Sequence, residues 1–294
     1  MKALHRGSKI ALVASARKVT TEEIQFAVEW ITEKGFTPVY DGRLFQSDHI
    51  FAGDDEARAS VIQYYLDRDD IDALWVARGG YGSIRIIDRL DFSSFMHHPK
   101  YIIGFSDITV FHGQIQRLGF ESIHASMPYN LINKTPEALQ SLYDALTGQR
   151  LQYRINASPL NRLGDVKGKI VGGNLSVLYG MLGSASFPET KGKILFIEEV
   201  DEYIYHIDRM MIALKRAGML KQLKGLVVGG LTKINDNPDP FGKTAEEVIL
   251  EAVSDYDYPV CFGFPAGHFD DNRAIIINRT AHLSVSNDCV IFDE

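Results

Sequence analysis

The sequence has few of the features that mark secreted, membrane or nucleic-acid-binding proteins. Its 294 residues include only two cysteines, Cys261 and Cys289, so it has neither a disulfide framework nor a C-x-x-C metal or redox motif. No apolar stretch approaches the length of a membrane span. Lys and Arg are scattered, and a net charge of −7 argues against nucleic acid or an anionic membrane as a partner.

The N-terminal pattern is also a poor match to a signal peptide, and the common cofactor motifs do not occur. The apolar run Ile10–Ala16 is short and ends in Arg17 and Lys18, which predicts a first buried strand rather than a secretion signal. There is no H-E-x-x-H zinc motif, and Ser15–Lys18 matches S-x-x-K without its usual companion motifs. We therefore expect a cytoplasmic protein.

The hydrophobic content, 45% of the residues, is enough for a sizeable core, and the length suggests two domains. Strand and helix patterns alternate through residues 1–150, which predicts a parallel sheet covered by helices on both faces. The predicted strands are Lys9–Val13, Thr37–Tyr40, Ala73–Ala77 and Tyr101–Phe105, and the predicted helices include one opened by a capping box at Thr20–Glu23, then Ala57–Leu66, Ile84–Leu90 and Pro136–Leu146.

This rhythm is lost over residues 151–165, which we interpret as a linker. Residues 166–294 then mix strands and helices and end, from Val260 to Phe292, in short strands separated by Gly, Pro and Asn turns. The fold class predicted is α/β for the first domain, with a mixed α+β, β-rich second domain.

Ser106 is the most informative single residue. It follows the apolar run Tyr101–Phe105 and precedes a helical pattern that ends near Gly119, so it lies at a strand-to-helix corner. A serine at such a corner lies beside free N–H groups of a helix start, as acyl transfer requires. The alternative is that Ser106 or Asp107 only caps the helix.

A serine nucleophile needs a base, and His268 is the best placed of the nine histidines. It ends the Gly/Pro loop Gly263–His268 after a predicted buried strand, where a side chain can be directed into a cleft. His112 follows Ser106 too closely on the same helix to approach it. The histidines in polar, terminal or loop contexts, His5, His97 and His98, are expected to be solvated.

The base needs an orienting carboxylate, and acids cluster in Lys193–Glu202. A strand ending in Glu198-Glu199 brings carboxylates to the carboxyl edge of a sheet, where α/β sites gather. Because side chains alternate along a strand, at most one of the two acids faces a given pocket. The alternative is a solvated acidic rim.

The glycine-rich segment Arg78–Ser83 also follows a predicted strand. One interpretation is that this segment binds a phosphate in a non-enzymatic nucleotide-binding protein, although it lacks the spacing of a P-loop or a G-x-G-x-x-G motif. Its glycines equally suit a tight turn that brings backbone N–H groups close to a reacting carbonyl.

Together these segments resemble the LD-carboxypeptidase family, serine peptidases that include muramoyltetrapeptide carboxypeptidases and microcin-immunity proteins. The resemblance covers essentially the whole chain and is carried by Arg78–Ser83, Gly104–Asp107, Gly172–Ser176, Leu195–Glu199, Asp208–Met210 and Gly263–His268. One departure is His124-Ala-Ser-Met127, where family members often show His-Gly-Pro-Met. A second is Glu198-Glu199, where the family often has Glu-Asp.

The resemblance implies a Rossmann-like first domain that carries the nucleophile Ser106, and a second domain that supplies the carboxylate Glu198 and the base His268. It also implies an oxyanion hole formed by the backbone N–H groups of Asp107 and Gly80, no cofactor, and a homodimer. The expected reaction is hydrolysis of the L,D bond before the terminal D-alanine of murein tetrapeptides, in cytoplasmic peptidoglycan recycling. The alternative enzyme is a microcin-immunity-type peptidase that cleaves a peptidyl-nucleotide amide, although such proteins tend to be longer.

Overall fold

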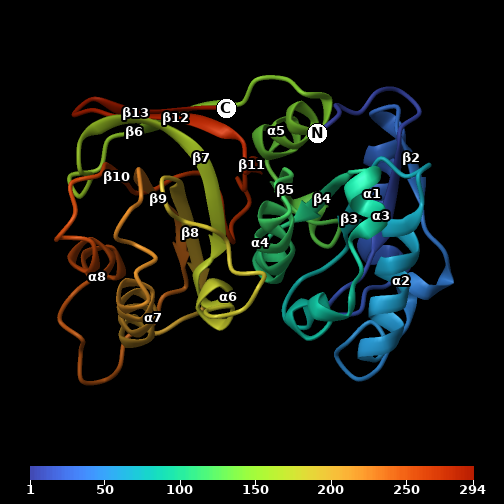
Figure 1. Cartoon of the computed structure of the whole chain (residues 1–294), viewed down its shortest axis with the longest axis horizontal. Helices are drawn as coiled ribbons and strands as arrows, with labels where there is room; N and C mark the ends of the chain where they lie inside the picture. The colour runs from blue at the N-terminus through green and yellow to red at the C-terminus, as the bar shows by residue number, and fades with distance from the viewer.

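Two β-sheets, each with its own helices, make up the protein, as the computed structural model of residues 1–294 shows (Figure 1). The first sheet has six strands, in the spatial order β11 (Ile275–Ile277), β5 (Ser122–His124), β4 (Tyr101–Gly104), β3 (Ala73–Val76), β1 (Lys9–Val13) and β2 (Thr37–Val39). Strands β1 to β5 are parallel, and β11 runs antiparallel to β5.

Helices cover the first sheet because its central strands are apolar on both faces. Every residue of β3 and β4 is buried, which is the pattern of a parallel sheet enclosed by helices. The helices of this half are α1 (Thr21–Glu33), α2 (Asp55–Asp67), α3 (Ser93–His97), α4 (Thr109–Arg117) and α5 (Pro136–Thr147). Helix α1 begins at the predicted capping box, in which Thr20 and Glu23 exchange side-chain-to-backbone hydrogen bonds.

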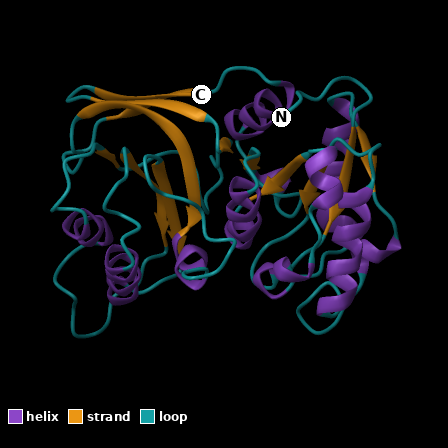
Figure 2. Cartoon of the chain, in the orientation of Figure 1, coloured by secondary structure: helices purple, strands orange, loops and turns teal.

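The second sheet has seven strands, in the order β10 (Val260–Cys261), β9 (Gly225–Thr232), β8 (Ile194–Val200), β7 (Gly164–Asn174), β12 (Thr280–Val285), β13 (Cys289–Asp293) and β6 (Gln152–Asn156). Strands β7 to β10 are parallel, whereas β12, β13 and β6 pair antiparallel. Its helices are α6 (Leu175–Gly180), α7 (Ile204–Arg216) and α8 (Ala245–Ala252). This half is therefore mixed and β-rich, and Figure 2 shows its long strands opposite the helix-covered first sheet.

Two sequence-based expectations differ from the structure. Residues 151–165, predicted as a linker, contain β6, whose partner β13 lies more than a hundred residues away and leaves no local sequence signal. The predicted helix Ile84–Leu90 is instead a pair of 3-10 turns at Ser83–Arg85 and Ile87–Arg89. So short a segment, with no side-chain cap, gains too few hydrogen bonds to propagate an α-helix.

The two halves share one apolar core, so their facing edges are held together. A single cluster of 41 buried residues includes Trp75 and Ile123 of the first sheet and Ile170 and Phe196 of the second. Helix α4 lies between the sheets and packs against β7 and α6 (Figure 1). Strand β11 also crosses from the second half of the chain to the edge of the first sheet. This shared core fixes the carboxyl ends of β4 and β8 relative to each other.

The helices of this protein do not have the length and apolar character needed to cross a membrane.

Candidate active site

Ser106 occupies a tight corner at the end of β4. Its φ of +63° lies in the left-handed region, which is unfavourable for a non-glycine residue and occurs mainly where surrounding structure enforces it. The corner requires glycine at position 104, because a Cβ there would lie 2.7 Å from Ile108 Cγ1. The short 3-10 turn Ser106–Ile108 then leads into α4. Ser106 therefore occupies the turn between β4 and α4.

Neither Ser106 nor Asp107 caps that helix, so the capping interpretation is wrong. The 3-10 turn and α4 both lack a side-chain cap. The Asp107 carboxylate instead accepts a hydrogen bond from the Ser83 backbone N–H at 2.9 Å. The Ser106 hydroxyl lies 3.0 Å from Nε2 of His268.

His268 lies between Ser106 and Glu198, on the loop that follows β10. Its Nδ1 is 2.7 Å from Oε2 of Glu198. A carboxylate only accepts hydrogen bonds, so Nδ1 carries the proton and the Nε2 of the neutral ring can accept from Ser106. The Phe105 ring packs 4.8 Å from the imidazole, centroid to centroid, and fixes it from the side.

Glu198 and Glu199 point to opposite sides of β8, as strand alternation predicts. Both are buried, so the solvated-rim alternative is wrong. Glu198 faces His268, whereas Glu199 accepts hydrogen bonds from Asn174 Nδ2 at 3.0 Å and from the Ser176 N–H at 2.7 Å. The Gly172–Ser176 motif therefore binds the neighbouring acid and does not contact the imidazole.

The pKa of His268 reflects two opposing effects. Burial disfavours the imidazolium and would lower the pKa, but the charge and hydrogen bond of Glu198, with the further charge of Glu199, raise it above the ordinary value of 6.5. The raised pKa makes the imidazole a stronger base, which suits a group that must take a proton from Ser106 during a reaction.

Another histidine near the corner, His112, supports it and has no hydrogen bond to the nucleophile. Buried His112 bonds to the Gly104 carbonyl at 2.9 Å and to the Ser122 hydroxyl at 2.8 Å. Burial lowers the pKa of His112 to about 4, with the Gly104 carbonyl opposing, so the ring is neutral. His112 thus stabilises the backbone at Gly104, the glycine that the corner requires.

Ser106 and His268 open into a cleft of about 620 Å³ whose wall also includes Phe105, Met127 and Tyr129. Four cationic side chains line the same cleft: Arg17, Arg78, Lys134 and Lys233. The sequence identified none of them as a cleft cation, although Arg78 begins the glycine-rich segment Arg78–Ser83. The position of three of these residues in the sequence could have identified them. Arg17, Arg78 and Lys233 each lie shortly after a strand of a parallel array, at the edge where sites gather.

Two backbone N–H groups beside Ser106 are free to bind a ligand. The amides of Gly80 and Asp107 donate no hydrogen bond within the chain. Gly80, with φ of +103°, also lines the cleft, and a Cβ there would lie 2.7 Å from Arg17 Cδ. The segment 79–82 leads into a 3-10 turn rather than an α-helix, so it lacks the helix N-terminus of a phosphate-binding loop.

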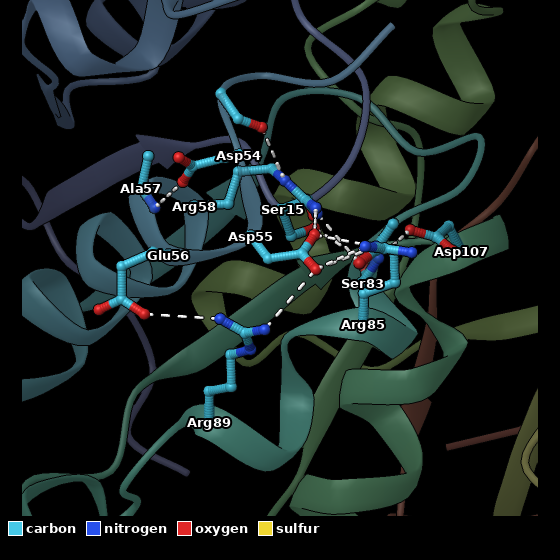
Figure 3. A network of polar contacts seen from close by, with 12 residues as sticks. Ser15, Asp54, Asp55, Glu56, Ala57, Arg58, Ser83, Arg85, Arg89 and Asp107 are labelled. Atoms are coloured by element: carbon cyan, nitrogen blue, oxygen red, sulfur yellow. Dashed lines mark hydrogen bonds and ion pairs between the residues drawn. The ribbon is translucent and has the colours of Figure 1, made fainter. Parts of the chain in front are cut away.

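A buried arginine fixes the loops that carry these groups (Figure 3). Arg58, 1% exposed, donates to the carbonyl oxygens of Ser15 at 2.5 Å, Gly82 at 3.0 Å and Gly53 at 3.2 Å, and it pairs with Asp55. The loops after β1 and β3 are thereby joined to α2. The Asp107 carboxylate also accepts from the Ser83 N–H, so a hydrogen bond joins the segment that carries the Gly80 amide to the segment that carries the Asp107 amide.

We expect Arg58→Met to lower the free energy of unfolding by about 3 kcal/mol. The change leaves the Ser15 and Gly53 carbonyls without a donor, removes one of the two donors to the Gly82 carbonyl, and breaks the ion pair with partly buried Asp55. Urea denaturation measures this. The matched control is Arg89→Met, whose half-exposed side chain also pairs with Asp55 and should cost about 0.5 kcal/mol or less. Equal losses in the two variants would contradict the structural importance of Arg58.

The fold and this side-chain arrangement are those of a hydrolase whose site lies between two α/β halves. Residues 10–125 match the N-terminal domain of LD-carboxypeptidases, and residues 167–283 match the C-terminal domain. The chain belongs to the LD-carboxypeptidase family and is a peptidase of that family.

Three relatives illustrate the similarity. The chain is 30% identical to the probable murein peptide carboxypeptidase of Bacillus subtilis, over 99% of this chain and 93% of that protein. It is 25% identical to the microcin C7 self-immunity protein MccF of Escherichia coli, over 87% and 84%. The crystal structure of muramoyltetrapeptide carboxypeptidase from Oxalobacter formigenes superposes with a TM-score of 0.88 at 27% identity, covering 97% of this chain and 98% of that one.

Proposed function

We propose that this protein is a serine-type L,D-carboxypeptidase that removes the terminal D-alanine of murein tetrapeptides. The observation that carries the proposal is the continuous hydrogen-bonded series Ser106–His268–Glu198, which opens into a cationic cleft. The relatives named for murein peptides and muramoyltetrapeptide support the substrate class. Cytoplasmic murein recycling and a homodimeric assembly are part of this proposal through the family resemblance.

In the first half-reaction, Ser106 Oγ attacks the carbonyl carbon of the L,D bond, and its proton passes to Nε2 of His268. Glu198 holds the ring through Nδ1 and stabilises the imidazolium that forms. The negative charge that develops on the carbonyl oxygen is received by the N–H groups of Gly80 and Asp107. The imidazolium then gives its proton to the nitrogen of D-alanine as the C–N bond breaks, which leaves an ester on Ser106.

In the second half-reaction, water replaces D-alanine. His268 removes a proton from the water, whose oxygen attacks the ester carbonyl, and the same amides receive the oxyanion. The imidazolium returns the proton to Ser106 Oγ as the ester bond breaks. The products are the shortened peptide, D-alanine and the original enzyme, and no step needs a metal ion or an organic cofactor.

Release of D-alanine from a purified muropeptide tetrapeptide, with EDTA present, tests the proposal. We expect stoichiometric D-alanine and tripeptide, at the same rate with and without the chelator. Loss of activity on chelation, or no release from the tetrapeptide under any condition, would refute a metal-independent L,D-carboxypeptidase.

We expect kcat/KM to fall on the acid side with a midpoint above pH 6.5, because the base works only when neutral and the pKa of His268 is raised. Activity is therefore retained above this pKa and lost as the pH falls through it. A pH–rate profile of the tetrapeptide reaction measures the midpoint. In Glu198→Gln the residual activity should show a lower midpoint, since the main cause of the raised pKa is removed. An unchanged midpoint would contradict this coupling.

A second candidate is cleavage of a peptidyl-nucleotide amide, as the relationship to a microcin self-immunity protein suggests. The cationic cleft favours it as well, because a phosphate-bearing substrate would also be attracted there. Parallel assays on the tetrapeptide and on a peptidyl-adenylate analogue separate the two. A higher kcat/KM for the tetrapeptide supports the recycling enzyme, and the reverse ratio supports the alternative.

A further inference from the structure

We propose that Arg17 and Lys233 together bind the terminal carboxylate of the substrate and thereby restrict the enzyme to the last peptide bond. This inference rests on the proposed function and assigns the specificity that the reaction needs. A carboxypeptidase must recognise a free carboxylate one residue beyond the bond that it cleaves. Charge-assisted hydrogen bonds from cationic side chains are the usual means of doing so.

Two of the four cations in the cleft are already engaged by the protein. Arg78 donates to the Lys18 carbonyl at 3.2 Å and to Glu23 at 3.4 Å, and its guanidinium lies 3.9 Å from the centroid of the Tyr129 ring. Lys134, whose side chain is 10% exposed, donates to the Phe269 carbonyl at 2.9 Å and lies 3.7 Å from Asp270. Arg78 and Lys134 therefore stabilise the wall of the cleft through these contacts.

Arg17 and Lys233 are different, because both are exposed and neither side chain has a hydrogen-bond or ion-pair partner in the protein. The only acid that lines the cleft is Asp270, which lies beside Lys134. In a protein of net charge −7, a cleft with four cations and one acid attracts an anionic substrate.

Arg17 lies next to the predicted oxyanion site. Its backbone N–H donates to the Gly79 carbonyl at 3.4 Å. Its side chain also covers Gly80 so closely that a Cβ there would lie 2.7 Å from Arg17 Cδ. In a peptide, the terminal carboxylate carbon and the preceding carbonyl carbon are separated by about 3 to 3.7 Å, because three backbone bonds join them. A carbonyl oxygen bound at the Gly80 N–H therefore brings the terminal carboxylate within reach of the Arg17 guanidinium.

Lys233 comes from the other half of the protein. It follows β9, and the pairing of Val200 with Thr232 brings it beside the end of β8, the strand that carries Glu198. Its positive φ of +53° turns the chain sharply at this point. A carboxylate held by Arg17 and Lys233 would thus bridge the two halves across the cleft that contains Ser106 and His268.

Steady-state kinetics on two substrates test this assignment: the murein tetrapeptide and the same peptide amidated at its C-terminus. Arg17→Gln and Lys233→Gln should each raise KM for the free acid about 10- to 100-fold, with kcat changed less than about 3-fold. The amide should be a poor substrate for the unmodified enzyme, and its KM should not change in either variant. Arg17→Lys should restore part of the affinity, because it keeps the charge but loses the bidentate fork. The control is Lys191→Gln, which removes an exposed lysine outside the cleft and should change neither KM.

Two results would overturn the assignment. One is an unchanged KM for the free acid in both variants. The other is an equal loss on the two substrates, which would indicate that Arg17 and Lys233 act only through the cleft structure.

A binding measurement separates failure of this inference from failure of the proposed function. Calorimetry with Ser106→Ala protein measures the affinity for the tetrapeptide without turnover. If the unmodified enzyme releases no D-alanine, yet the affinity falls about 10-fold or more on adding Arg17→Gln or Lys233→Gln, the carboxylate site stands and the reaction is wrong. If the affinity is the same with and without these changes, the carboxylate site is wrong.

Discussion

Ser106→Ala is expected to lower kcat for D-alanine release by about 10⁵- to 10⁶-fold while leaving the protein folded, because it removes the nucleophile of a triad that acts as a unit. The only hydrogen-bond partner of the Ser106 hydroxyl is His268, so the change leaves no buried backbone group without its partner. Initial rates and a thermal melt of the same preparation give the two quantities.

The matched control is Ser60→Ala, which removes a hydroxyl bonded to the Ala57 carbonyl on the exposed side of α2. It should leave the rate unchanged. Activity in Ser106→Ala within about 10-fold of the unmodified enzyme would refute a serine mechanism. The remaining rate, if any, comes from the oxyanion amides and substrate binding.

Glu198→Gln is expected to reduce kcat about 10³- to 10⁴-fold, because an amide cannot stabilise the imidazolium and can present the wrong hydrogen-bonding group to Nδ1. The comparison is Glu199→Gln on the same strand, measured with the same substrate. Glu199 contacts Asn174, Ser176 and the Val200 N–H rather than the imidazole. That change should reduce kcat less than about 10-fold.

Glu199→Gln should affect stability more than rate. Burial, with the charge of Glu198, raises the pKa of Glu199, whereas its hydrogen bonds to Val200, Asn174 and Ser176 favour the charged form. Replacing it by glutamine removes an acceptor for the Ser176 amide at the start of α6. If Glu199→Gln proved more damaging to kcat than Glu198→Gln, the orienting carboxylate would be the other residue.

Local patterns were sufficient to predict much of the fold. Fully apolar runs predicted β3 and β4, and a capping box predicted the start of α1, because these signals are contained in a few adjacent residues. Strand alternation also predicted that Glu198 and Glu199 face opposite ways. The side chains named as a triad lie in hydrogen-bond contact, and their catalytic roles stay predictions.

The features that were missed depend on distant pairing. Strand β6 is defined by its pairing with β13, and β11 joins a sheet built almost wholly from the first half of the chain. The cations of the cleft were also missed because they come from segments that are far apart in the sequence. Arg17 and Lys233 are more than two hundred residues apart, and no motif in the sequence marks either as a binding residue. Only the meeting of the two sheets brings both into one cleft.

Mass spectrometry of the protein quenched during turnover of the tetrapeptide tests the central claim most directly, because it locates the acyl group. The account predicts an adduct of the substrate less D-alanine on the peptide that contains Ser106, and no adduct in Ser106→Ala. An acyl group on any other residue, or turnover by Ser106→Ala at the rate of the unmodified enzyme, would contradict it.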